Sequence, residues 1–191
     1  MKFKILLLSC ILLAGLTIIG CASDSDDDKA VTSCDQTTFK KDDSIQSLCG
    51  LTTTGNHVVI KGLQVPAGEE FVLYARTSAT GDNGVTYTFD GDSAELTVAY
   101  KDSTATGSTV SINSMQNWLF GIFEESPAVH IIVKNSNDAN QDPEDYTSVI
   151  DIEPDEWTAG APASTSFYYR ATSGVTISSV KVFFEEHDHE E

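Results

Sequence analysis

Short runs of alternating apolar and polar residues recur along most of this chain. In the run at 57–61, for example, Val58 and Ile60 share one face, and Leu96, Val98 and Tyr100 share a face further on. This period of two is typical of half-buried strands, because successive side chains of a strand point to opposite faces. Similar runs occupy 71–76, 85–89, 129–134, 167–170 and 175–184, the last with a parity switch at Ser178–Ser179 that predicts a β-bulge. Gly, Asn, Asp, Ser and Pro cluster between the runs, so the sequence predicts an all-β sandwich or jelly-roll-like fold.

Two segments depart from this period and predict one or two short helices. Between 114 and 125, five apolar residues fall at i, i+3, i+4, i+7 and i+8: Met115, Trp118, Leu119, Ile122 and Phe123. Ser114 is a candidate N-cap. Gly121 inside this segment and the acidic pair at 124–125 disfavour a helix, so a strand is the alternative there. Ile45, Leu48 and Cys49 show the same spacing, and they predict one or two helical turns before a glycine.

The chain begins with two lysines among its first four residues, followed by an almost wholly apolar run from 5 to 19. The run is shorter than the approximately 20 residues that a transmembrane helix needs, so it predicts a signal peptide. It ends in Ile18-Ile19-Gly20-Cys21, which resembles the lipobox of bacterial lipoproteins. The resemblance implies cleavage before Cys21, a lipid on that cysteine, and a protein attached to a membrane, stably once several acyl chains are present.

Residues 21–33 are mostly small or charged and predict a flexible acidic tether. We therefore expect a signal peptide at 1–20, the tether at 21–33, a β-sandwich domain at 34–185 and an acidic, histidine-containing tail at 186–191. Ala22 follows the lipidated cysteine, where enteric bacteria place an aspartate to retain lipoproteins at the inner membrane. By that analogy, the protein is expected at the outer membrane or cell surface.

Acidic residues dominate the composition. The whole chain has a formal net charge of −18, and removal of Lys2 and Lys4 with the signal peptide leaves nine basic against 29 acidic residues, a charge of −20. Such a surface repels nucleic acid and anionic lipid headgroups, which excludes nucleic acid as an expected partner. It attracts cations, although solubility alone also explains it.

The four cysteines divide into two groups. Cys10 leaves with the signal peptide and Cys21 carries the lipid, so Cys34 and Cys49 remain in a compartment that permits disulfides. They predict one disulfide that closes a loop of about 15 residues and clamps it to the start of the domain.

Two segments are candidate metal sites. Asp138, Asn140 and Asp142 in the acidic loop at 135–145 place oxygen ligands at alternate positions, as calcium loops do, although Pro143 and Val149 break the EF-hand pattern. A solvated turn is the alternative interpretation of this loop. In the tail, His187 and His189 point the same way in an extended chain, and they predict a weak site for Zn²⁺, Cu²⁺ or Ni²⁺.

Catalytic motifs are missing from the sequence. It contains no G-x-S-x-G elbow, H-E-x-x-H pair, Walker loop or dinucleotide fingerprint. His57 and His130 lie within strand patterns opposite the aliphatic residues, and we expect partly exposed strand histidines there. An envelope hydrolase that uses loop carboxylates is the alternative function, and it requires two carboxylates about 5–10 Å apart in one cleft.

The last two predicted strands, 167–170 and 175–185, resemble the closing hairpin of bacterial jelly-roll modules that bind carbohydrate. The resemblance implies sugar stacking on aromatic side chains. The aromatic residues of interest are Trp118, Trp157, Tyr168 and Tyr169. Trp157 lies in a predicted loop, where it is either a plug over the end of the sandwich or an exposed ligand platform. We therefore expect a lipid-anchored binding or structural module whose partner is a carbohydrate or a protein at the cell surface.

Overall fold

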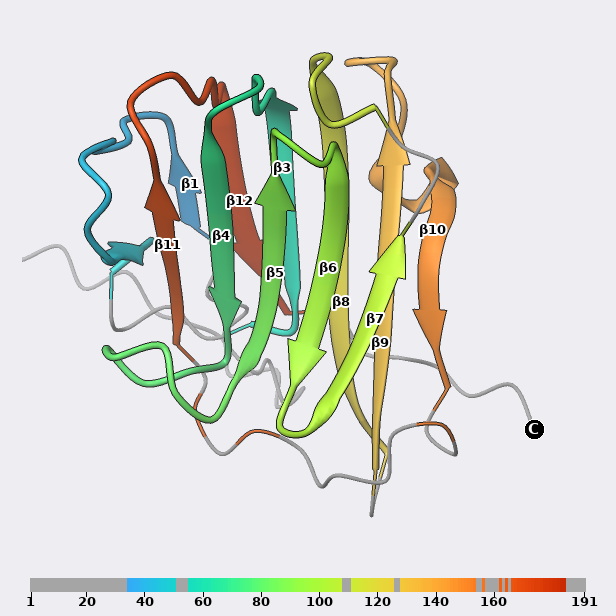
Figure 1. Ribbon diagram of the computed structural model, residues 1–191. Coiled ribbons are helices and arrows are strands. Elements are labelled where there is room, and N and C mark those ends of the chain that lie inside the picture. Colours follow the sequence, from blue (N-terminus) through green and yellow to red (C-terminus); the bar gives the residue numbers. More distant parts are fainter. Residues whose placement is uncertain are drawn as a thin grey trace, which may run out of the picture.

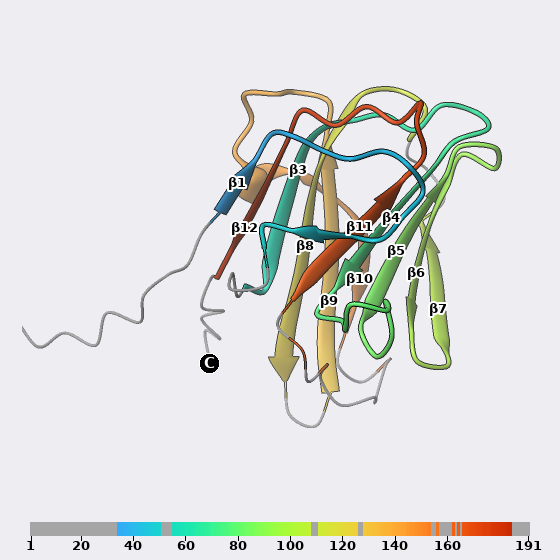
Figure 2. The same cartoon turned by 90° about the vertical axis from the view of Figure 1, so that its left-hand side faces the viewer.

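The computed structural model describes residues 34–50, 55–107, 111–125, 128–153, 156, 162, 164 and 166–184. They form two six-stranded antiparallel sheets that pack face to face (Figures 1 and 2), which confirms the predicted β-sandwich. In order across the first sheet, the strands are β1 (Cys34–Gln36), β12 (Ser179–Phe183), β3 (His57–Leu63), β8 (Gln116–Glu125), β9 (Ala128–Ser136) and β10 (Thr147–Ile152). Across the second sheet they are β2 (Gln46–Leu48), β11 (Phe167–Ala171), β4 (Glu70–Ala75), β5 (Val85–Asp90), β6 (Glu95–Tyr100) and β7 (Ser103–Gly107).

The core between the sheets is rich in aromatic rings. The ring centroids of Tyr87 and Phe120 lie 4.7 Å apart, and those of Phe89 and Trp118 lie 4.9 Å apart with their planes at 82°. These contacts join β5 of the second sheet to β8 of the first. Offset and edge-to-face pairs of this kind stabilise a core beyond the area that they bury, by about 0.5–1.5 kcal/mol each.

The helix predicted over 114–125 is wrong, because the segment is strand β8 in the centre of the first sheet. Trp118, Phe120 and Ile122 face the core, whereas Leu119 and Phe123 lie on the opposite face and are also buried. A strand covered on both faces is apolar at consecutive positions, and such a run matches helical spacing by chance. Gly121 allows close packing here, because a Cβ atom at this position would lie 2.6 Å from Ile132.

The helical turns predicted at 45–49 are also wrong. Residues 46–48 form strand β2, which pairs with β11 so that Leu48 lies opposite Phe167 in the core.

The predicted disulfide is confirmed: Cys34 and Cys49 are bonded, with their Cα atoms 5.8 Å apart. The bridge joins β1 of the first sheet to the end of β2 in the second, and so fastens the two sheets together at one side.

The parity switch predicted near Ser178–Ser179 corresponds to an irregularity in the pairing with β3. Thr176 forms an isolated bridge with Gln64, and regular pairing of β12 starts only at Ser179. Opposite the break, Gly62 adopts a φ of +64°. This break allows both Val175 and Val180 to reach the core despite their opposite parity.

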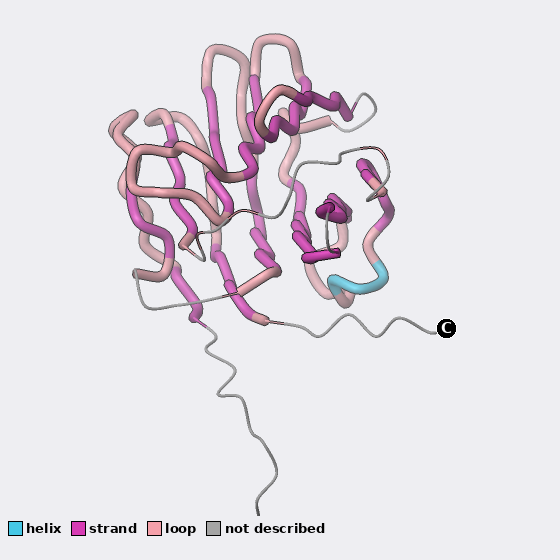
Figure 3. Tube along the Cα trace, turned by 90° about the horizontal axis from the view of Figure 1, so that it is seen from below, coloured by secondary structure: helices cyan, strands magenta, loops and turns pink. Residues whose placement is uncertain are grey.

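Helical structure in the described part of the chain is limited to one 3-10 turn, η1 (Pro143–Asp145), drawn in cyan in Figure 3. Among the described residues, no helix is long and apolar enough to span a membrane.

Candidate functional site

The acidic loop, residues 135–145, leaves β9 and folds back against the outer face of the first sheet. η1 contacts β8, and Tyr146 directly after it packs with Val59 and Leu119 in a small apolar cluster outside the main core. Burial, and then the negative charges of Asp142 and Asp138, raise the pKa of Tyr146 above its ordinary value. The loop is thus fixed in place by an apolar anchor, and it forms a wall of two separate grooves.

The first groove, which we call the amide groove, has a volume of about 420 Å³. It is lined by Ser111, Gln116, Asn135, Ser136, Asn137, Gln141, Thr147, Ser148 and Val149. These described lining residues include no charged side chain, although the chain carries a net charge of −18. Eight of the nine present a hydroxyl or an amide.

The strand register explains why these polar groups meet. Trp118 of β8 lies opposite Asn135 of β9, and side chains alternate along each strand. Gln116 and Asn135 therefore continue the inward-facing rows of β8 and β9 to the point where the apolar core ends. The register of β10 shifts between Ser148 and Ile150, and Val149 in this bulge lines the same groove. Bulges of this kind commonly redirect side chains next to functional sites.

Hydrogen bonds within the lining hold the amide side chains in place. Asn135 Nδ2 donates to Gln116 Oε1 over 3.4 Å, and Ser136 Oγ donates to Gln141 Oε1 over 2.5 Å. Gln141 Nε2 in turn donates to the backbone oxygen of Asp145 over 2.6 Å. The groove therefore presents donors and acceptors whose positions are set before any ligand arrives.

The second groove, which we call the lysine groove, lies on the outer face of the first sheet and has a volume of about 510 Å³. It is lined by Asp35, Val59, Lys61, Leu119, Asp142, Pro143, Glu144, Ser179, Lys181 and Phe183. The lining combines two lysines from the strands and two carboxylates of the acidic loop with several apolar side chains. The Lys181 ammonium also lies 5.4 Å from the centre of the Phe183 ring, within cation–π range.

The candidate calcium ligands occupy different places in the acidic loop. The Asp138 carboxylate accepts a hydrogen bond from the Asn140 backbone N–H at 2.9 Å, and the Asp142 carboxylate accepts one from Glu144 at 3.2 Å. Both carboxylates therefore cap turns of their own loop, and Asp142 also lines the lysine groove. Calcium binding by this loop stays a prediction.

The two strand histidines differ in burial. His57 is only 2% exposed, so the expectation of partial exposure is wrong for it; its ring stacks on Phe183 at 5.2 Å and meets the edge of Phe123 at 4.9 Å. His130 is partly exposed, as expected, and its Nε2 lies 2.8 Å from a carboxylate oxygen of Asp151. Neither histidine lines either groove.

The candidate aromatic platforms are mostly parts of the fold. Trp118 and Tyr169 belong to the main core, and Tyr168 is also buried. The indole N–H of Trp118 has no hydrogen-bond partner within the described part of the chain. Trp157, the predicted lipidation residue Cys21 and the tail histidines His187 and His189 lie outside the described residues.

The protein is thus an antiparallel two-sheet β-sandwich with two open grooves, and the acidic loop forms a wall of each. No protein-family model matches the sequence, and a search of curated proteins finds no significant match. Solved structures with a similar shape include a galectin, LEC-6, from Caenorhabditis elegans (10% identity, TM-score 0.44, covering 80% of this chain and 96% of that one). The carbohydrate-binding module CBM66 from Bacillus subtilis is similar at 12% identity and a TM-score of 0.39, over 80% of this chain and 92% of that one.

An exo-inulinase from Aspergillus awamori is also similar, at 13% identity and a TM-score of 0.47. The likeness covers 82% of this chain but only 29% of the exo-inulinase. At such identities and TM-scores, none of these likenesses assigns a ligand or an activity to this chain.

Proposed function

We propose that this protein is a binding module, attached to the outer membrane or cell surface through a lipid on Cys21, and that its amide groove binds a neutral carbohydrate. The observation that carries the proposal is the set of described residues that line the amide groove, which offer hydroxyls and side-chain amides and include no charged group.

The chemistry of this lining matches that of a sugar. A side-chain amide offers both donors and an acceptor, and a hydroxyl offers both, so each can pair with either role of a sugar hydroxyl. An anionic ligand would find no cation in the lining and would meet a strongly acidic molecule. A cation would find no carboxylate there. A neutral ligand that is rich in hydroxyls therefore pairs with this groove at the lowest desolvation cost.

The strand order supports presentation of the groove away from the membrane anchor. The chain enters the domain at β1, one edge of the first sheet, whereas the amide groove is formed by β8, β9 and β10 at the opposite edge (Figure 1). Five strand spacings separate β1 from β10, a distance of about 24 Å at about 4.8 Å per spacing. A tether joined at Cys34 would therefore leave the groove open to a ligand.

Binding of immobilised oligosaccharides tests the proposal. The full chain, purified in detergent, is applied to an array of neutral and acidic glycans, and we expect retention on neutral members only. For a retained glycan, Gln116→Ala together with Asn135→Ala should weaken binding by about tenfold or more, because each lost hydrogen bond contributes about 0.5–1.5 kcal/mol.

Gln46→Ala is the matched control, because Gln46 is an amide on β2 of the second sheet and lines neither groove. This variant should bind as the unchanged protein does, and thermal unfolding should show that all variants are folded. Retention of acidic glycans alone, or equal binding by the Gln116/Asn135 variant, would contradict the proposal.

A hydrolase that uses loop carboxylates is the second candidate, and one observation favours it. Asp142 and Glu144 line the lysine groove together with Asp35, so several carboxylates face one hollow. Hydrolysis of a glycosidic bond needs one carboxyl as acid and a second as base or nucleophile. Release of reducing ends from a bound glycan, abolished by Asp142→Asn or Glu144→Gln, would establish this activity in place of simple binding.

A further inference from the structure

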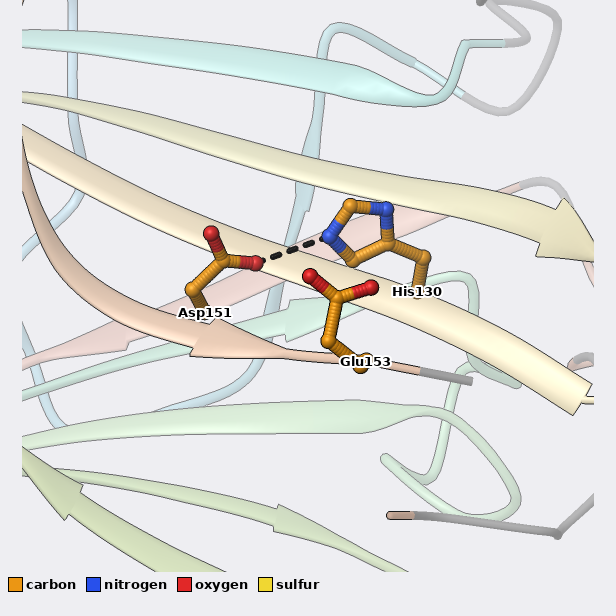
Figure 4. A group of neighbouring side chains, drawn as sticks. All are labelled: His130, Asp151 and Glu153. Atoms are coloured by element: carbon orange, nitrogen blue, oxygen red, sulfur yellow. Dashed lines mark hydrogen bonds and ion pairs between the residues drawn. The ribbon is translucent and has the colours of Figure 1, made fainter. Parts of the chain in front are cut away.

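Three side chains with metal-binding atoms meet on the outer face of the first sheet, away from both grooves. They are His130 of β9 and, from β10 and the residue after it, Asp151 and Glu153 (Figure 4). One ligand atom from each lies within 4.8 Å of the other two. None of the three lines the amide groove or the lysine groove.

The antiparallel register brings the three together. Ile152 lies opposite Ile131, and both are buried in the core. The next position along the ladder therefore places Glu153 opposite His130, and the period of two turns Asp151 and Glu153 to the same outer face. The imidazole thus lies across from one carboxylate and diagonal to the other, the arrangement drawn in Figure 4.

Contacts on the sheet hold the imidazole in a defined orientation. The Phe123 ring of β8 lies 5.7 Å from the His130 ring, and the Asp151 carboxylate lies 2.8 Å from His130 Nε2. The His130 side chain is 13% exposed and that of Asp151 is 52% exposed, so the cluster opens to solvent on one side. His130 and Asp151 lie on strands, and ligands mounted on strands are placed more accurately than ligands on loops.

We propose that His130, Asp151 and Glu153 bind a divalent transition-metal ion of the zinc class, with solvent completing its coordination. One imidazole nitrogen and two carboxylate oxygens form a set that suits Zn²⁺ and its neighbours, whereas Ca²⁺ requires six to eight oxygen ligands. Two ligands of one tetrahedral zinc ion lie about 3.4 Å apart when each bond is about 2.0–2.2 Å, so side-chain rotations that move the ligand atoms by about 1 Å close the site. This inference does not depend on carbohydrate binding.

Calorimetric titration of the full chain with ZnCl₂ tests the proposal, provided that the histidine-containing tail is treated separately. His187→Ala with His189→Ala removes the tail imidazoles, and this variant is the reference protein. We expect it to bind one Zn²⁺ per chain, and to bind Ca²⁺ and Mg²⁺ at least tenfold more weakly at this site. In the reference background, His130→Ala and Glu153→Gln should each weaken Zn²⁺ binding by at least about tenfold.

Glu153→Gln is the decisive variant, because Glu153 is exposed and lies just beyond the end of β10, so the fold does not depend on its charge. Glu95→Gln is its matched control, an exposed carboxylate on β6 of the second sheet that should leave Zn²⁺ binding unchanged. The proposal would be overturned if the reference protein did not bind Zn²⁺, or if the Glu153→Gln and Glu95→Gln variants bound it equally well.

Discussion

At the scale of single residues, the bond between Cys34 and Cys49 connects two parts of the molecule that belong to different sheets. β1 and β2 are edge strands of three residues each, one in each sheet. Such short strands contribute few ladder hydrogen bonds and little apolar area. The disulfide therefore limits how far the amino-terminal part of the domain can separate from the rest.

Removal of this disulfide should lower stability measurably. Closing a loop of this length contributes about 3 kcal/mol in the chain-entropy model, so reduction, or Cys34→Ser with Cys49→Ser, should lower the free energy of unfolding by about that amount. Denaturant unfolding with and without a reducing agent measures the difference. Two free thiols in the native, unreduced protein would contradict the assignment.

Glu69 provides a prediction for acid conditions. Hydrogen bonds from the Thr172 side chain and from the Gly174 backbone N–H, the latter at 3.0 Å, hold the pKa of Glu69 below its ordinary value of 4.5. A carboxyl whose pKa is lower in the folded state contributes stability above its unfolded pKa, and that stability is lost as pH falls through the folded pKa. The free energy of unfolding should thus decrease as pH falls below about 4.5.

Glu69→Gln should be less stable than the unchanged protein near neutral pH and should show a shallower decline in acid. Denaturant unfolding at a series of pH values between about 6 and 3 measures both slopes. Parallel slopes for the two proteins would show that Glu69 does not link folding to pH.

At the scale of elements, the acidic loop forms a wall of both grooves, and its affinity for cations is open to a direct test. If Asp138, Asn140 and Asp142 bind Ca²⁺ in the folded protein alone, a hundredfold excess over the dissociation constant should add about 2.7 kcal/mol to the free energy of unfolding. Mg²⁺ should add less, because it gives up its water ligands reluctantly. Differential scanning calorimetry in matched CaCl₂, MgCl₂ and NaCl measures the shifts.

The calcium effect should disappear in Asp138→Ala with Asp142→Ala. Equal shifts with both divalent ions would indicate general screening of the acidic surface instead. The loop would then be a solvated turn whose carboxylates serve to cap its own backbone, as their hydrogen bonds to Asn140 and Glu144 already do.

Strands with one buried and one open face are the easiest to predict from a period of two. β5 and β6 alternate strictly in burial, and both were expected from a period of two. β8 was not expected as a strand, because Leu119 and Phe123 are buried on its outer face, so that its sequence does not alternate between apolar and polar residues. β7 and β10 escaped prediction because they are edge strands with exposed threonines, serine and aspartate. β7 has no large apolar residue, and in β10 only Ile150 and Ile152 alternate.

The candidate sites depend on information that a single sequence does not contain. Gln116 and Asn135 face one groove because of the pairing between β8 and β9, and His130 meets Glu153 because of the register between β9 and β10. Neither register can be read from local spacing. The pair of cysteines was predictable, since a disulfide needs only two thiols in an oxidising compartment and not a known register.

At the scale of the whole molecule, we propose that an acidic β-sandwich is attached to a membrane through residues that precede its first strand. Cells fed a clickable palmitate analogue should label this protein, and Cys21→Ser should abolish the label, because the thiol of Cys21 is the proposed acceptor of the diacylglycerol. Gel fluorescence after membrane isolation measures both. Labelling that persists in the Cys21→Ser protein would contradict lipid attachment at this residue.

The side-chain amides of the amide groove themselves report on the proposed binding of a neutral carbohydrate. Asn and Gln NH₂ groups give resolved ¹H–¹⁵N resonances, so titration of the labelled protein with a neutral oligosaccharide retained on the array shows which amides contact the sugar. If the groove binds the sugar, the side-chain resonances of Gln116, Asn135 and Gln141 should show saturable shifts, and the Gln46 resonance should stay unchanged. Saturable shifts confined to residues of the lysine groove, such as Lys61 and Lys181, would contradict it.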